Sequence, residues 1–172
     1  MKKILTLLAF SLLALGLGAQ ETGASFVQNK TIKATGRVFR SEGIVFFSAP
    51  DQLRMNYLDP KGEYLIIDGT MVRSKVGTRQ VDVDTEKNPE MWGFRSTLLH
   101  CILGEYKAAA LVNDADIAVD TKDDGKTVTL TARKQAAKGY SRIVAEYDAK
   151  NRPVHLILDE FNGNSDEYIF EY

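Results

Sequence analysis

Cysteine and histidine are scarce in this chain of 172 residues, which contains one cysteine, Cys101, and two histidines, His100 and His155. A single cysteine cannot form an internal disulfide, so the fold must depend on the burial of apolar side chains. Transition-metal sites are normally built from several histidine and cysteine ligands, which this chain does not supply. We therefore expect neither a metal site nor a cofactor.

Recognisable catalytic motifs are also missing. The adjacent His100 and Cys101 are the one pair that resembles a nucleophile with its base. They fall in a helical pattern, where neighbouring side chains point about 100° apart, so they do not form a dyad. Cys101 is expected to be a small buried apolar residue. Without a glycine-rich phosphate loop or a G-x-S-x-G motif, we predict that the protein is not an enzyme.

Five aspartates follow one another closely near two predicted turns: Asp114, Asp116, Asp120, Asp123 and Asp124. Their spacing differs from that of a calcium-binding loop, and aspartate is common in turns. The chain has no excess of positive charge either, with 22 basic and 23 acidic residues. This balance predicts no nucleic-acid partner and no strong overall attraction to anionic membranes.

A long apolar run occurs only at the N-terminus. Lys2-Lys3 give a positive start, Ile4 to Leu17 are apolar, and the small residues Gly18 and Ala19 follow. This three-part pattern predicts a cleaved signal peptide over residues 1–19, and the run is shorter than the roughly 20 residues that span a bilayer. We expect residues 20–172 to form one domain, exported and soluble in the periplasm.

Alternating apolar and polar residues dominate the remaining sequence, and the clearest example begins at Leu53. Leu53, Met55 and Tyr57 alternate with polar residues, which is typical of a half-buried strand. A turn symmetric about Pro60-Lys61 would place Tyr57 opposite Tyr64 and Met55 opposite Ile66. Leu53, Met55, Tyr57, Tyr64 and Ile66 are then predicted to share one apolar face of a sheet.

Similar runs separated by short polar turns predict roughly ten antiparallel strands, and a twisted sheet of that size must curl. A helix interrupts them near the middle of the chain. Asn88 is a suitable N-cap, Pro89 suits the first helical position, and Gly104 suits the end. A second short helix is expected over Glu105 to Leu111. The fold class is thus mainly β (α+β), a curved antiparallel sheet with a lid helix over its hydrophobic concave face.

The lid helix and the concave face would enclose either a packed core or a hydrophobic cavity with Trp92 at its mouth. The predicted ligand-binding residues are Leu53, Met55, Tyr57, Tyr64, Ile66, Trp92, Leu98, Leu99 and Ile102. A cavity would make the protein a carrier or binding protein for an apolar ligand. A filled core would instead favour an interaction or sensor module that binds a protein partner.

Three stretches resemble periplasmic lipoprotein carriers of the LolA type: Phe26-Val27-Gln28, the block from Pro50 through Tyr57 to Pro60, and Ile66-Ile67-Asp68-Gly69. A looser similarity continues to Tyr172. The resemblance implies an incomplete β-barrel whose cavity carries acyl chains of lipoproteins towards the outer membrane. It also implies an inner-membrane donor complex and an outer-membrane acceptor as partners.

The chain departs from this family pattern in three places. Ala49 stands where carriers of the family have an arginine that helps to close the lid. The family's helix before Phe26 is expected to be missing or reduced to a few residues, and the segment after the last family strand is expected to be absent. We therefore expect a divergent, truncated member, either a lipid-binding or an accessory protein.

Overall fold

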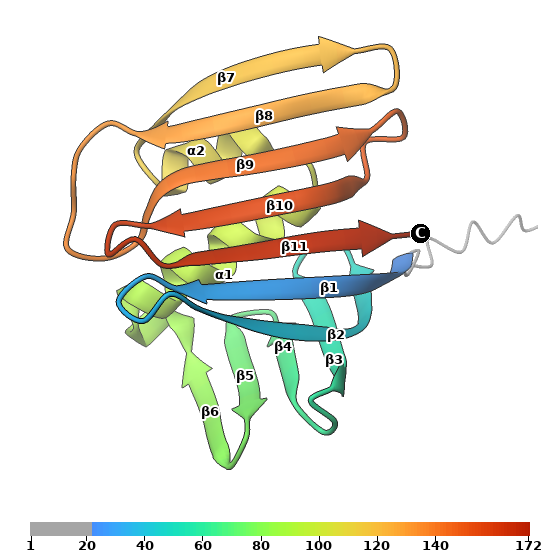
Figure 1. Ribbon diagram of the computed structural model, residues 1–172. Helices are drawn as coiled ribbons and strands as arrows, with labels where there is room; N and C mark the ends of the chain where they lie inside the picture. Colours follow the sequence, from blue (N-terminus) through green and yellow to red (C-terminus); the bar gives the residue numbers. More distant parts are fainter. Residues whose placement is uncertain (1–21) are drawn as a thin grey trace, which may run out of the picture.

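Eleven strands form one antiparallel sheet in the computed structural model, which describes residues 22–172 (Figure 1). The predicted signal peptide lies outside the described residues. The strands are β1 (Thr22–Ile32), β2 (Arg37–Ser48), β3 (Gln52–Asp59), β4 (Tyr64–Asp68), β5 (Met71–Val76), β6 (Arg79–Asp84), β7 (Ala115–Lys122), β8 (Gly125–Ala132), β9 (Tyr140–Asp148), β10 (Pro153–Glu160) and β11 (Ser165–Glu171).

The strands follow the order β6-β5-β4-β3-β2-β1-β11-β10-β9-β8-β7, so β6 and β7 are the two edges of an open, curved sheet. Between them along the chain lie a short 3-10 helix, η1 (Thr85–Lys87), and the helices α1 (Pro89–Ile102) and α2 (Tyr106–Val112). The helical segment therefore runs from one edge of the sheet to the other across one face (Figure 1). The predicted fold class is confirmed.

Local signals determine both ends of α1, as predicted. The Asn88 side chain accepts a hydrogen bond of 3.1 Å from the Met91 N–H, and Pro89 occupies the first turn. Gly104 follows the helix with a φ of +73°, a conformation in which an L side chain would be strained. The short helix expected after Gly104 is α2.

The concave face of the sheet and the apolar side of α1 share one continuous core. Leu53, Met55, Leu98, Leu99 and Ile102 all belong to it, and each is at most 7% exposed. The two layers are also joined by a polar contact, because the Tyr147 hydroxyl on β9 donates a buried 2.7 Å hydrogen bond to the carbonyl oxygen of Cys101. The sheet and α1 are thus joined by one buried apolar core.

The predicted register between β3 and β4 is wrong by one residue. Met55 lies opposite Leu65 and Leu53 lies opposite Ile67. The Tyr57 N–H donates to the Glu63 carbonyl, so the five residues between them form a connection centred on Pro60 rather than on Pro60-Lys61.

A shift of one residue moves every side chain of a strand to the opposite face. Tyr64 and Ile66 are therefore half-buried on the convex face, while Leu65 and Ile67 face the core, at 7% and 1% exposure. The concave face thus differs from the predicted one in its β4 residues.

We predict different costs for the same truncation at two adjacent positions. Ile67→Ala should lower the free energy of unfolding by about 2–5 kcal/mol because it opens a cavity in the core. Ile66→Ala should lower it by less than about 1.5 kcal/mol, because its half-buried side chain borders solvent. Denaturant unfolding of both variants measures these values. Equal costs, or a larger cost for Ile66→Ala, would contradict the observed register.

Candidate functional site

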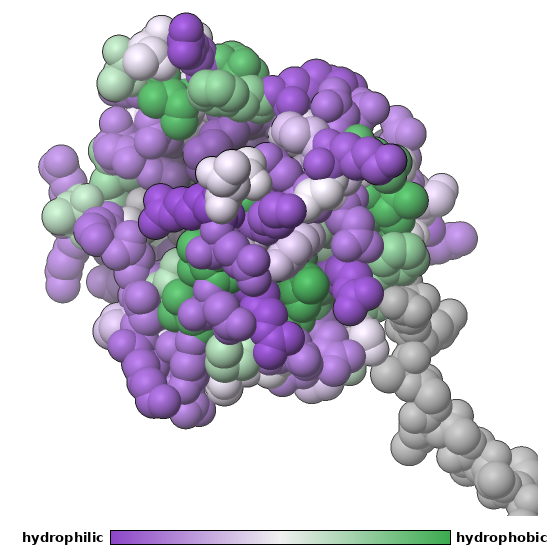
Figure 2. Space-filling view, turned by 90° about the horizontal axis from the view of Figure 1, so that it is seen from below, coloured by the Kyte–Doolittle hydropathy of each residue, from purple (hydrophilic) through white to green (hydrophobic). Residues whose placement is uncertain are grey.

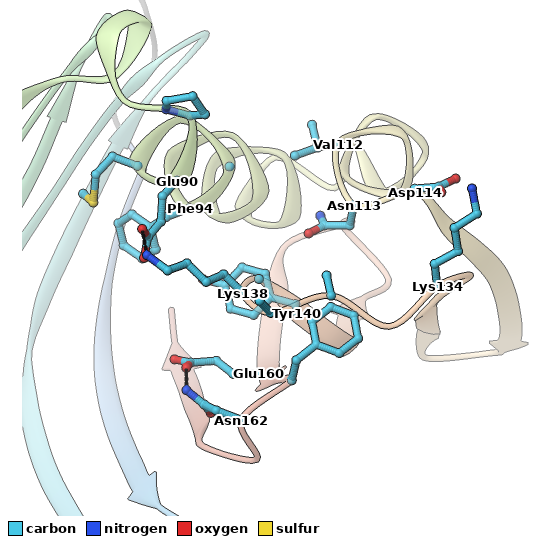
Figure 3. Close-up of a pocket in the computed structure, with 17 residues that line it drawn as sticks. Glu90, Phe94, Val112, Asn113, Asp114, Lys134, Lys138, Tyr140, Glu160 and Asn162 are labelled. Carbon is cyan, nitrogen blue, oxygen red and sulfur yellow. Dashed lines mark hydrogen bonds and ion pairs between the residues drawn. The ribbon is translucent and has the colours of Figure 1, made fainter.

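A cavity of about 770 Å³ lies beside the N-terminal half of α1 (Figure 3). Its walls come from four segments that are distant in sequence: the start of α1, the end of α2, the loop from β8 to β9, and the turn from β10 to β11. The apolar residues of the lining are Pro89, Met91, Phe94, Val112, Ala136, Ala137, Tyr140 and Phe161. The volume falls within the roughly 300–1,000 Å³ that small-molecule sites occupy.

The α1 wall contains Gly93, which leaves room in the cavity. A Cβ atom built at Gly93 would meet no heavy atom within 4 Å, apart from its own helix backbone and chain neighbours. Phe94, the next residue, also lines the cavity and packs against the core. Phe94 therefore gives the cavity an apolar wall, while Gly93, which has no side chain, leaves free volume beside it.

The loop of residues 133–139, between β8 and β9, closes one side of the cavity. Arg133 at its start bonds Asp114 at 3.1 Å and Asp116 at 2.7 Å. At its other end the Gly139 carbonyl accepts a 3.2 Å hydrogen bond from the Phe161 N–H of the β10–β11 turn. Hydrogen bonds thus hold both ends of the loop, and its middle is held by side-chain contacts.

One of these contacts is an ion pair between Lys138 of the loop and Glu90 of α1 (Figure 3). Both side chains are exposed, and exposed ion pairs contribute at most about 1 kcal/mol. Lys134, Asp114 and Glu160 add further charges to the lining. The rim of the cavity is therefore charged and is bridged by a weak ion pair, while much of the cavity wall is apolar.

Tyr140 supplies a polar group within this lining. Burial raises the pKa of its hydroxyl above the ordinary value, helped by the charges of Asp166 and Glu160. The phenol therefore stays protonated at neutral pH and can donate a hydrogen bond. A carbonyl or ether oxygen of a ligand is a suitable acceptor.

A hydrogen-bonded cluster lies on the concave face below this end of α1. The Tyr57 hydroxyl donates to Gln28 Oε1 at 2.8 Å, and Gln28 Nε2 donates to Asp166 Oδ1 at 2.9 Å and to the Tyr168 hydroxyl at 3.1 Å. Burial, followed by the charge of Asp166, raises the pKa of Tyr57. Tyr57, a predicted ligand contact, thus has its hydroxyl engaged in an internal network.

None of the nine predicted ligand-binding residues lines the large cavity. Leu53, Met55, Leu98 and Leu99 pack together in the core at 0–4% exposure. Tyr57 packs against the same core. The structure therefore brings these five together in the core.

The other four predicted residues lie in three different places. Tyr64 and Ile66 are on the convex face, and Trp92 is 45% exposed on α1 outside the cavity wall. Ile102 borders a second, smaller cavity of about 150 Å³ at the opposite end of α1. The other residues around that small cavity are Ala24, Val45, Phe47, Leu103, Pro153, Phe170 and Tyr172.

Sequence reasoning missed the residues of the large cavity because most of them lie outside periodic segments. Ala136 and Ala137 belong to a loop with no alternation and no helical spacing. The one available signal is the length of this loop, seven residues between two antiparallel strands, where hairpins commonly use two to five. Long loops of this kind are often functional.

The structure places the residues first considered as catalytic or metal-binding candidates in other surroundings. His100 Nδ1 lies 2.8 Å from Glu105 Oε2, and Cys101 is 1% exposed in the core. Asp114 and Asp116 pair with Arg133. Among residues 22–172, no group of three or more His, Cys, Asp or Glu side chains could hold a metal ion.

The sequence matches the family described as outer membrane lipoprotein carrier protein LolA over residues 18–172. The chain belongs to this LolA family, whose open curved sheet with helices on one face it shares. A comparison with curated protein sequences gave no match. No helix of residues 22–172 combines the length and apolar character needed to cross a bilayer.

Several solved structures are similar to this chain. A putative outer membrane lipoprotein-sorting protein domain from Vibrio parahaemolyticus is 10% identical, with a TM-score of 0.45 over 91% of this chain and 85% of that one. A LolA superfamily protein from Nitrosomonas europaea is 7% identical, with a TM-score of 0.41 and coverages of 90% and 86%. The Mycobacterium tuberculosis lipoprotein LppX is 10% identical, with a TM-score of 0.41 and coverages of 87% and 85%.

We predict that Cys101 does not react with a thiol reagent in the native protein at about pH 8. Burial raises the pKa of the thiol to about 12 and also blocks access, so labelling requires unfolding. Because the unfolded thiol ionises near 9.0, its contribution to stability should decline as the pH rises above that value. Labelling with and without denaturant checks the first point, and rapid native labelling would contradict it.

Proposed function

We propose that this protein is a non-enzymatic periplasmic carrier that binds acyl chains of lipoproteins, or another lipid-like apolar ligand, in the large cavity beside α1. Membership of the LolA family and the 770 Å³ cavity are the observations that support this proposal. The cavity is the one that carries most weight, because a binding protein for an apolar ligand needs free volume with apolar walls.

The apolar wall and the charged rim of the cavity suit the apolar chain and the polar end of an amphiphile. An acyl chain gains about 0.8 kcal/mol for each CH₂ group that leaves water, and the apolar wall around Phe94 and Phe161 provides that environment. The charged rim around Glu90 and Lys138 suits the polar end of the ligand. In this arrangement the chain enters first and the polar end stays at the mouth.

Entry of the chain requires movement of the loop of residues 133–139. The exposed Glu90–Lys138 ion pair offers little resistance, while the bonds of Arg133 and Gly139 keep the two ends of the loop in place. The loop can then swing outwards as a flap without disturbing β8 or β9. Delivery towards the outer membrane would require an inner-membrane donor and an outer-membrane acceptor.

The core residues predicted as ligand contacts have a role only in a more open state. Leu53, Met55, Leu98 and Leu99 would meet an acyl chain if α1 moved away from the sheet. Their burial in the closed state means that such a movement exposes apolar surface, which a bound chain would cover again. We propose this as the state that binds longer chains.

The packed middle of the molecule favours a second candidate, an interaction or sensor module that binds a protein partner. The two functions differ in what the purified protein contains. Mass spectrometry of protein isolated from the periplasm without detergent would detect a stoichiometric lipid or acylated peptide for a carrier. A mass equal to that of the protein alone, together with no uptake of a fluorescent fatty acid, would favour the interaction module.

We predict that Gly93→Phe blocks ligand uptake. The new side chain would project into the open space of the cavity, and replacing a helical glycine also favours the helix. The affinity for a fluorescent fatty acid, measured by titration, should fall at least about tenfold, the loss from about 1.4 kcal/mol of binding free energy.

Gly93→Ala is the matched control, since its single methyl group leaves most of the cavity free. This variant should bind the probe as the unchanged protein does, with equal or higher thermal stability. Unchanged binding by folded Gly93→Phe would show that the cavity is not the ligand site.

We further predict that Tyr140→Phe weakens binding of an acyl ester more than binding of the corresponding hydrocarbon chain. The substitution keeps the ring of this cavity-lining residue and removes its hydroxyl, so about 0.5–1.5 kcal/mol of hydrogen-bond energy would be lost for the ester alone. Parallel titrations with an ester probe and an alkane-tailed probe measure this difference. An equal effect on both probes would count against a hydrogen bond from Tyr140.

A further inference from the structure

The hairpin of β1 and β2 has an unusual concentration of positive charge at its tip. Lys30, Lys33, Arg37 and Arg40 occur within eleven residues, and no aspartate or glutamate occurs from Thr22 to Ser41. The near-zero net charge of the whole chain conceals this local asymmetry. A local cluster can attract an anionic surface even when the net charge of a protein does not.

Two of these cations have no opposite charge beside them. Lys30 pairs with Asp166 at 2.9 Å and Arg40 pairs with Glu42 at 2.7 Å. Lys33 and Arg37 form no ion pair with any described residue of the chain, and both side chains are exposed. They are therefore the two charges at the tip that are available to a partner.

Large apolar side chains accompany these free cations. Val38 is 59% exposed and Phe39 is 53% exposed. They lie on the part of β2 that pairs with β1 alone, since β3 first pairs with β2 at Glu42. Exposed apolar side chains next to free cations are typical of segments that enter the interfacial region of a membrane.

The hairpin tip also adjoins the end of the molecule that contains the large cavity. The Lys33 N–H donates to Asn164 Oδ1 at 3.1 Å, and the Lys33 side chain packs directly against Gly163. Phe161 and Asn162 of that same β10–β11 turn line the cavity. Figure 1 shows the β1–β2 turn, the β10–β11 turn and the β8–β9 loop at the same side of the sheet.

The surface does not offer a broad apolar face for docking in the view of Figure 2, where apolar side chains form separate groups among polar ones. A contact made by small apolar groups within a charged surface fits a headgroup layer better than it fits a large hydrophobic protein interface. Charge and exposure thus point to the same kind of partner.

We propose that the β1–β2 hairpin tip docks this protein on an anionic phospholipid membrane, with Val38 and Phe39 in the interfacial layer and Lys33 and Arg37 beside lipid phosphates. The inference rests on the proposed carrier function, because docking here brings the cavity mouth to the membrane from which, or to which, a lipid passes. Contact through this tip alone gives weak and reversible attachment, as a carrier requires.

Vesicle sedimentation tests the proposal with the exported protein. Vesicles of phosphatidylcholine mixed with phosphatidylglycerol should bind it, vesicles of phosphatidylcholine alone should bind it much less, and raised salt should release it. Replacing Lys33 and Arg37 by glutamine should lower the partition coefficient about fivefold for each cation. Replacing Val38 and Phe39 by serine should also lower it.

Control variants remove the same kinds of group elsewhere on the surface. Lys107→Gln with Lys150→Gln changes the net charge equally, and Leu111→Ser removes an apolar side chain that is 84% exposed on α2. These variants should sediment with anionic vesicles as the unchanged protein does. Equal losses from hairpin and control variants would overturn the proposal, because attachment would then be non-specific.

The remaining outcomes separate docking from cargo binding. Gly93→Phe should still sediment with anionic vesicles although its cavity is filled, so failure of lipid uptake alone leaves the docking result intact. An absence of sedimentation by the unchanged protein would overturn docking, whatever the cavity binds. Saturable binding of the hairpin to an acidic peptide, without sedimentation, would assign the surface to a protein partner and also overturn it.

Discussion

The crossing of the concave face by α1 is the constraint on which the rest of the structure depends. The chain leaves the sheet at one edge, β6, and must return at the opposite edge, β7. The connection has to pass over the apolar face, and the 14 residues of α1 extend only about 21 Å. A helix of that length covers the middle of a curved sheet of eleven strands and leaves its two ends less covered.

The two ends of α1 are enclosed in different ways, and this explains why one cavity is much larger. At the C-terminal end, Tyr147 binds the Cys101 carbonyl and α2 begins after a short turn, so strand and helix lie close together. At the N-terminal end much of the surroundings is irregular, namely the loop of residues 133–139 and the β10–β11 turn. Arg133 and Gly139 hold the ends of one loop, and the space beneath its middle is not filled by an element of regular structure.

The features that could be predicted from the sequence are those decided by neighbouring residues. The start of α1 is specified by Asn88 and Pro89 and its end by Gly104, and period-two alternation located the strands. It was harder to predict which β4 side chains lie on which face of the sheet, because this depends on whether the connection around Pro60 has an odd or an even number of residues. The cavity was harder still, because four distant segments form its walls and its loop has no periodic pattern.

The open sheet leaves β6 and β7 without a neighbour on one side, and unpaired strand edges can join other copies of a chain. The sequence of β7 opposes this. Antiparallel self-pairing centred on Ala118 would bring Asp116 of one copy opposite Asp120 of the other. Like charges at directly opposite positions destabilise strand pairing. Two of the aspartates that first suggest a cation site, Asp116 and Asp120, thus disfavour pairing of the exposed β7 edge with a second copy in this register.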